Sequence, residues 1–327
     1  LTELEAARTP NLDVLAKDGV CGLHVPIGPG ITPGSGPSHL SLFGYDPIKY
    51  QVGRGVLSAL GIDFALTDRD VAARGNFCTV DEDGKVVDRR AGRISTERSK
   101  ELCALLRQIS LPGVDLFVEP EKEHRFVLVL RGDGLEPKIG DTDPQSTGVQ
   151  PLEPEPLSPD AVDTAKLVAR FVEQARRILA GHRPANMILL RGFARQPDWP
   201  SFGQVFGVRA AAIAAYPMYR GLAKLIKMEA LRARDDLEEE LDVLRQRWDD
   251  FDFFYVHAKH TDSAGEDGNF DEKVSVIEEV DTLIPRLMAL QPDVVVVTGD
   301  HSTPWSLRAH SWHPVPVLLW SKFCRPD

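Results

Sequence analysis

The chain has 327 residues, of which 43% are hydrophobic and 27% charged, and its formal net charge at pH 7 is -11. This composition is typical of a soluble globular protein with one or two domains. The acidic balance argues against general nucleic-acid binding, and the apolar runs are too short to span a membrane.

The first predicted elements are a short helix and a glycine-rich loop. Pro10 begins a helix over residues 11–17, and Gly19 ends it. Residues 28–36 contain four glycines and two prolines, which favours a loop. Because an α/β domain usually begins with a strand, we expect a chain trimmed at its start and, after the last strand, at its end.

The middle of the chain alternates strands with helices. The turn at residues 81–84 joins two predicted strands, 75–80 and 85–88, in a hairpin. Further strands are predicted at 126–131, 186–190 and 251–256, and six prolines make 137–159 an irregular connection. Helices are predicted at 96–109, 160–180, 221–228, 235–248 and 271–290.

Four consecutive valines, residues 294–297, predict a strand, and a last strand follows at 315–320. A continuous β-branched run is typical of a central parallel strand that is buried on both faces. Helices that alternate with such strands indicate an α/β fold. Ligands in these folds bind at the carboxyl ends of the strands.

Carboxylates and imidazoles gather at three such strand ends. Asp300 and His301 follow the valine strand, Asp262 and Glu266 follow the strand 251–256, and His310 precedes the last strand. Together these side chains supply enough ligands for two divalent metal ions. Taken alone, the Asp-His pair is equally consistent with a turn.

Ser35 is a candidate nucleophile because it lies between two glycines, directly before a predicted helix. The free N–H groups at a helix N-terminus favour an anion. A serine hydroxyl becomes reactive when a divalent cation lowers its pKa. The alternative is a serine that only forms a turn or caps the helix.

Six arginines within 34 residues indicate a site for a small anion, since one planar guanidinium group can donate two parallel hydrogen bonds to a phosphate or carboxylate. They are Arg74, Arg89, Arg90, Arg93, Arg98 and Arg107. For Arg98 and Arg107 a solvated helix face is an equal alternative. The four cysteines lack CxxC or CxxH spacing, so we expect them to be reduced.

Several motifs occur together, in order, along the whole chain. They are residues 4–13, Thr32-Pro33-Gly34-Ser35 with His39-Leu40, residues 44–47, 74–77 and 88–93, Thr261-Asp262-Ser263-Ala264-Gly265, Gly299-Asp300-His301-Ser302-Thr303-Pro304, and His310-Ser311 with Pro314-Val315-Pro316. In this combination the chain resembles the cofactor-independent phosphoglycerate mutases of the archaeal type, in the alkaline phosphatase superfamily.

The resemblance implies an alkaline-phosphatase-like α/β core, with a mostly parallel sheet flanked by helices, and an inserted smaller α/β or α+β domain. We expect the metal-binding core at residues 1–54 and 201–327, without the family's first strand and C-terminal end. We expect the inserted substrate-binding domain at 55–200. Closure of the two would exclude water from the reaction.

The resemblance also implies interconversion of 3-phosphoglycerate and 2-phosphoglycerate in glycolysis and gluconeogenesis, through a phosphoserine at Ser35. One metal would be held by Asp262, Glu266 and His310. The other would be held by Ser35, Asp300, His301 and an aspartate of the family's first strand. Manganese is preferred, with cobalt, magnesium and zinc as alternatives, and no bisphosphoglycerate is needed. Candidate substrate-binding residues are Arg74, Arg89, Arg90, Arg93, Arg131 and Arg191.

The chain departs from the family pattern at Glu266, where histidine is usual, and at Gly36, where an acidic residue is usual. These departures leave other functions open: a metal-dependent phosphatase, a mutase of another phosphorylated metabolite, or a non-catalytic phosphate-binding relative. We expect a cytoplasmic protein with a small-molecule substrate and neither nucleic acid nor membrane as partner. The sequence leaves the oligomeric state open.

Overall fold

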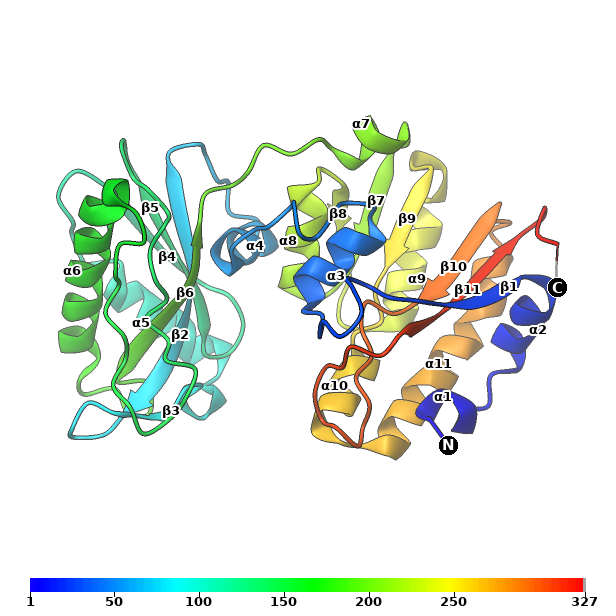
Figure 1. Cartoon of the computed structure of the whole chain (residues 1–327), viewed down its shortest axis with the longest axis horizontal. Coiled ribbons are helices and arrows are strands. Elements are labelled where there is room, and N and C mark those ends of the chain that lie inside the picture. The colour runs from blue at the N-terminus through cyan, green and yellow to red at the C-terminus, as the bar shows by residue number, and fades with distance from the viewer. Residues whose placement is uncertain (326–327) are drawn as a thin grey trace. The chain divides into compact units, whose positions relative to one another are not determined.

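The computed structural model describes residues 1–325 and divides the chain into two compact units (Figure 1). The first unit comprises Leu1–Gln51 and Pro200–Asp327, and the second comprises Val52–Trp199. Pro326 and Asp327, at the predicted trimmed end, lie outside the described residues. Among the helices of residues 1–325, none has the length and apolar character that a membrane crossing requires.

The first unit contains a parallel three-stranded sheet in the order β8-β7-β9. Its strands are β7 (Ala210–Ile213), β8 (Glu229–Leu231) and β9 (Phe253–Val256). The connecting helices are α8 (Pro217–Leu225) and α9 (Leu237–Gln246). Apolar side chains of β7 and α9, including Ile213 and Leu244, are buried against each other in one cluster. Each connecting helix thus covers the sheet, as in other βαβ units.

A second sheet in the same unit has the order β1-β11-β10, and both of its pairings are antiparallel. Its strands are β1 (Val20–His24), β10 (Val294–Thr298) and β11 (Val315–Ser321). The prediction that the valine run forms a central parallel strand buried on both faces is therefore wrong. Val295 is buried, whereas Val294 and Val296 are 55% and 53% exposed. β-Branched residues favour a strand, but the packed elements decide which face is covered.

The helix α2 (Pro10–Asp18) packs against β1 and β11 of this sheet and against α11 (Phe270–Met288). The buried carboxylate of Asp281 on α11 accepts hydrogen bonds from the backbone N–H of Leu12 at 2.7 Å and from the side-chain amide of Asn11 at 2.8 Å. The first turn of a helix has N–H groups without intrahelical partners. Asp281 satisfies two of them, those of Asn11 and Leu12, and so joins the two helices.

The second unit is built on one antiparallel sheet with the order β3-β2-β5-β4, in which β6 also pairs with β2. Its strands are β2 (Asp70–Val80), β3 (Val86–Asp88), β4 (Asp115–Pro120), β5 (Arg125–Arg131) and β6 (Met187–Ala194). Side chains alternate between the two faces of a sheet. One face carries Phe77, Phe126 and Ile188, which form the largest apolar cluster among the described residues.

Helices cover both faces of this sheet. α5 (Thr96–Leu106) and α6 (Val162–Leu179) contribute Leu102, Leu106 and Phe171 to the large cluster. The other face contacts α4 (Arg54–Gly61), whose residues from Gly55 onward are all buried. A Cβ atom at Gly55 would lie 2.2 Å from the carbonyl oxygen of Ala72, so this close approach of helix and strand requires glycine.

The remaining described elements are short. The helices are α1 (Glu3–Ala6), α3 (Ser35–Leu42), α7 (Phe202–Phe206) and α10 (His260–Asp267), and the 3₁₀ turns are η1 (Ala91–Arg93), η2 (Pro159–Ala161) and η3 (Trp248–Asp250). The mixed α/β class is confirmed. The mostly parallel sheet is not, because parallel pairing among the described strands is confined to β8-β7-β9.

We predict that Asp281→Ala lowers the free energy of unfolding by about 2–3 kcal/mol, because it leaves the part-buried Leu12 N–H and the Asn11 amide without an acceptor. Chemical denaturation measures this loss. Glu279→Ala, at an exposed position of the same helix, is the control and should change the free energy by less than about 0.5 kcal/mol. Equal effects of the two substitutions would contradict the proposed role of Asp281.

Candidate metal centre and anion site

The candidate metal ligands of the first unit lie at the ends of strands and helices. Ser35 is the first residue of α3, and His39 lies one turn further along the same helix. His257 directly follows β9, and Asp300 is the second residue after β10. Since strand ends bring their loops together, these side chains converge although they are far apart in sequence.

The first group of potential ligands comprises His39, His257 and Asp300, whose ligand atoms all lie within 4.8 Å of one another. Asp300 Oδ2 is 3.2 Å from His39 Nδ1 and 3.3 Å from Nε2 of His301. Two tyrosines enclose the group. The Tyr255 hydroxyl is 2.5 Å from His39 Nε2, and the rings of Tyr219 and His257 are 3.7 Å apart.

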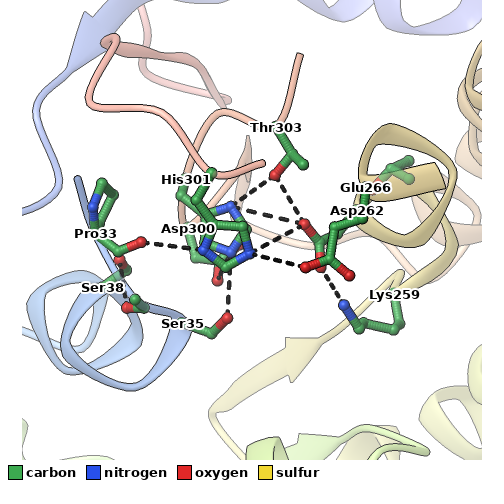
Figure 2. Close-up of polar contacts among 12 residues, drawn as sticks. Pro33, Ser35, Ser38, Lys259, Asp262, Glu266, Asp300, His301 and Thr303 are labelled. Atoms are coloured by element: carbon green, nitrogen blue, oxygen red, sulfur yellow. Dashed lines mark hydrogen bonds and ion pairs between the residues drawn. The ribbon is translucent and has the colours of Figure 1, made fainter. Parts of the chain in front are cut away.

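The second group comprises Asp262 on α10, His301 and His310. Asp262 Oδ1 is 3.8 Å from His301 Nδ1 and 3.6 Å from His310 Nε2. The two imidazole rings are stacked, with their centroids 3.6 Å apart. Figure 2 shows Asp262 and Thr303 facing His301, with Ser35 approaching from α3. One carboxylate and two imidazoles form a donor set that suits Mn²⁺, Zn²⁺ or Co²⁺.

Thr303 fixes the orientation and the tautomer of His301. Its hydroxyl donates to Asp262 Oδ1 at 2.8 Å, so it accepts from His301 Nδ1 at 2.9 Å. Burial lowers the pKa of His301, which keeps the imidazole neutral. The unprotonated nitrogen is therefore Nε2. A hydrogen-bond acceptor for the ring nitrogen that does not bind the metal is typical of metal-binding histidines.

Ser35 lies beside this unprotonated nitrogen. Its Oγ is 3.2 Å from His301 Nε2, which can accept the hydroxyl proton in a hydrogen bond (Figure 2). Ser35 is also the N1 residue of α3, where backbone N–H groups have no intrahelical acceptor. The hydroxyl oxygen thus sits next to a nitrogen lone pair and at the positive end of a helix.

Buried atoms without hydrogen bonds mark the first group as a cation site. Asp300 Oδ2 and His257 Nδ1 are buried and have no hydrogen-bond partner. Burial would raise the pKa of Asp300, but the interaction with His39 outweighs it and holds the pKa well below its usual range. Burial lowers the pKa of His257 to about 3, so its imidazole is neutral. An ionised carboxylate and a neutral imidazole fit a divalent cation.

The structure groups the predicted ligands differently from the sequence. Asp262 and His310 lie together as predicted, but His301 joins them, and Asp300 lies with His39 and His257. Glu266 is half exposed, and its Oε1 is 3.6 Å from His310 Nε2, at the edge of the second group. His39 and His257 were not predicted as ligands. The sequence contained a pattern that could have indicated both: His39 lies one helical turn after Ser35, and His257 directly follows a strand.

In the second unit, two predicted arginines face each other on neighbouring strands. Arg74 on β2 is paired with Arg191 on β6, and the Nε atoms of both are buried without a hydrogen-bond partner. Burial and the charges of Arg54, Arg125 and Arg191, only partly offset by Glu121, lower the pKa of Arg74 to about 10. Like charges placed opposite each other in a sheet are destabilising unless an anion compensates them.

The other predicted arginines have different surroundings. Arg131 makes two hydrogen bonds of 2.7 Å to the buried carboxylate of Asp70, and Arg89 makes two to Asp143 at 2.9 and 2.7 Å. Arg90 and Arg93 flank the turn η1. Burial lowers the pKa of His124 to about 3, and the positive charges of these two arginines and of Arg74 and Arg125 contribute to the same decrease. Arg125 and His124 were not predicted as site residues.

Residues 16–186 match a family model described as 2,3-bisphosphoglycerate-independent phosphoglycerate mutase. A probable enzyme of this name from Thermotoga maritima is 53% identical over 327 residues, which cover 99% of this chain and 81% of the relative. A probable enzyme of the same name from Aquifex aeolicus is 50% identical over 332 residues, which cover 98% of this chain and 82% of the relative.

Two solved structures are similar over the chain. A protein from Pyrococcus horikoshii has a TM-score of 0.84 and 29% identity, with 100% of this chain and 84% of that one covered. The cofactor-independent phosphoglycerate mutase from Thermoplasma acidophilum has a TM-score of 0.69 and 31% identity, with 99% and 85% covered. The fold and the site define a mixed α/β protein with carboxylate–imidazole groups beside a serine. The chain belongs to the 2,3-bisphosphoglycerate-independent phosphoglycerate mutase family, archaeal type.

We predict that Thr303→Val weakens Mn²⁺ binding about tenfold, because His301 Nδ1 loses the acceptor that fixes its tautomer. Isothermal titration of the purified protein with MnCl₂ measures the affinity. Thr282→Val, at an exposed position of α11, is the control and should leave the affinity unchanged. Unchanged binding in Thr303→Val would contradict the proposed role of the threonine.

Proposed function

We propose that this protein interconverts 3-phosphoglycerate and 2-phosphoglycerate without bisphosphoglycerate, through a phosphoserine at Ser35. The observation that carries this proposal is the position of Ser35 Oγ, 3.2 Å from an unprotonated imidazole nitrogen and adjacent to both ligand groups. Membership of the mutase family and the names of relatives about 50% identical to this chain support the choice of substrate.

Two divalent cations would be held by residues of the first unit. Asp262, His301 and His310 would bind one, with Glu266 beside them, and His39, His257 and Asp300 would bind the other. The bound cations would lower the pKa of the serine hydroxyl and stabilise negative charge on the transferring phosphoryl group. Manganese is the metal we propose, because the carboxylate of Glu266 beside the second group favours a harder ion.

The chain's own residues would carry out a two-step transfer. Ser35 Oγ loses its proton and forms a bond to phosphorus, while the bond to the glycerate 3-oxygen breaks and that oxygen takes up a proton. The bound glycerate then reorients. In the second step its 2-hydroxyl loses a proton and attacks the phosphoserine, which restores the Ser35 hydroxyl. The N-terminus of α3 would stabilise the phosphoryl oxygens throughout.

The arginines of the second unit would bind the anionic groups of the substrate. Arg74 is the strongest candidate, because its Nε is buried without a hydrogen-bond partner. Arg191 lies opposite it and has only longer ion pairs, with Asp141 at 3.7 Å and Asp143 at 3.6 Å. Arg90 and Arg93 would add positive charge near the same site. Arg89 and Arg131 are already held by buried carboxylates, so we assign them the role of supporting this unit. We propose that residues 52–199 serve as the substrate-binding domain.

We predict that Ser35→Ala abolishes the formation of 2-phosphoglycerate from 3-phosphoglycerate and leaves the fold intact. Phosphorus NMR, with Mn²⁺ and without bisphosphoglycerate, measures the conversion, and circular dichroism checks the fold. Ser41→Ala, on the same helix, is the control that should remain active. Activity in Ser35→Ala would rule out this nucleophile. Release of free phosphate without 2-phosphoglycerate in the wild type would favour a phosphatase instead.

We predict that Arg74→Lys raises KM for 3-phosphoglycerate at least about tenfold, because lysine cannot form the paired hydrogen bonds of a guanidinium group. Steady-state kinetics measures the change. Arg69→Lys is the control, since Arg69 is an exposed residue that pairs with Asp133 just before β2. A KM equal to that of the wild type would remove Arg74 from the substrate site.

A further inference from the structure

The arginines of the second unit surround a carboxylate that the proposed reaction does not use. Glu121 lies in the hairpin between β4 and β5, and its backbone N–H donates to the carbonyl oxygen of Arg125 at 2.9 Å. Its side-chain Oε2 is buried and has no hydrogen-bond partner. An unpaired buried carboxylate oxygen is costly, so its retention calls for a physical reason.

Three elements bring charged and polar groups to Glu121. Its carboxyl interacts electrostatically with Arg74 on β2 and Arg125 on β5, and it accepts a hydrogen bond from Ser58 on α4. Burial raises the pKa of Glu121, and these three neighbours oppose that rise. Glu121 thus provides negative charge beside arginines that otherwise repel one another.

The sheet register places these arginines on one face. Arg74 is opposite Arg191 on β6 and opposite Val127 on β5, and Arg125 is opposite Asn76. Residues two apart on a strand share a face, so Arg74 and Arg125 are diagonal neighbours. Asp141 and Asp143 lie 3.7 and 3.6 Å from Arg191, and Glu123 lies 4.0 Å from Arg125. For Arg74 the compensating charge comes from Glu121.

We propose that Glu121 is a positioning residue of the anion site, which holds the guanidinium groups of Arg74 and Arg125 in the orientation that binds the substrate. This inference rests on the proposed function of the arginines. Ser58 anchors the carboxyl from α4, so the geometry of the anion site depends on the packing of that helix against the sheet. Glu121 itself makes no contact with the reacting atoms.

The test is steady-state kinetics of Glu121→Gln, which keeps the shape of the side chain and removes its charge. KM for 3-phosphoglycerate should rise about tenfold while kcat changes less than about twofold, because an interaction that only orders the binding groups is lost. Glu119→Gln, on the preceding strand β4 and paired with Arg107, is the matched control and should leave both constants unchanged.

A second variant keeps the inference testable if Glu121→Gln fails to fold. Ser58→Ala removes the hydrogen bond to the Glu121 carboxyl and changes no arginine. It should also raise KM, by a smaller factor than Glu121→Gln. Stabilisation of the folded protein by added 3-phosphoglycerate, measured by thermal unfolding, should fall in parallel in both variants.

The outcomes separate this inference from the proposed function. If Arg74→Lys raises KM but Glu121→Gln leaves it unchanged or lowers it, the arginines bind substrate and the positioning role of Glu121 is wrong. A loss of kcat at constant KM in Glu121→Gln would also overturn that role. If Arg74→Lys leaves KM unchanged, the anion site itself is misassigned.

Discussion

The site of the first unit depends on the hydrogen bonds that orient the buried imidazole of His301. Its Nδ1 is tied through the Thr303 hydroxyl to Asp262, so its Nε2 lone pair is directed toward Ser35 and Asp300. This chain of contacts joins the helix α10, the loop after β10 and the N-terminus of α3. A change that rotates this one ring would misplace the nucleophile and both ligand groups together.

In the second unit, one face of the sheet gathers positive charge, because Arg74, Arg125 and Arg191 share it. A sheet that places Arg74 opposite Arg191 is stable only when anions compensate the repulsion. Asp141 and Asp143 lie near Arg191, the carboxyl of Glu121 interacts with Arg74, and a bound substrate would add further negative charge. Asp143 and Asp70 neutralise Arg89 and Arg131 in the same unit. The unit therefore combines arginines that hold the fold with arginines that remain open to a ligand.

Local patterns predicted many elements well, and the failures have identifiable causes. The predicted helix over residues 11–17 is α2, and the predicted hairpin is β2–β3. The strand β1 was not predicted because it is short, contains Gly22 and is mostly exposed. The helix α4 was not predicted because it is buried on all sides and lacks a polar face. The domain boundaries and the roles of the site residues remain predictions.

The sequence by itself determined the residue types of the site, the serine before a helix and the carboxylate–imidazole pairs at strand ends, because these are local patterns. It also determined the family, since its motifs occur in one order along the chain. Only the tertiary structure decided that His301 lies with Asp262 while Asp300 lies with His39 and His257. It also decided that the valine strand is antiparallel and half exposed. Such pairings depend on contacts between distant segments, which local periodicity does not encode.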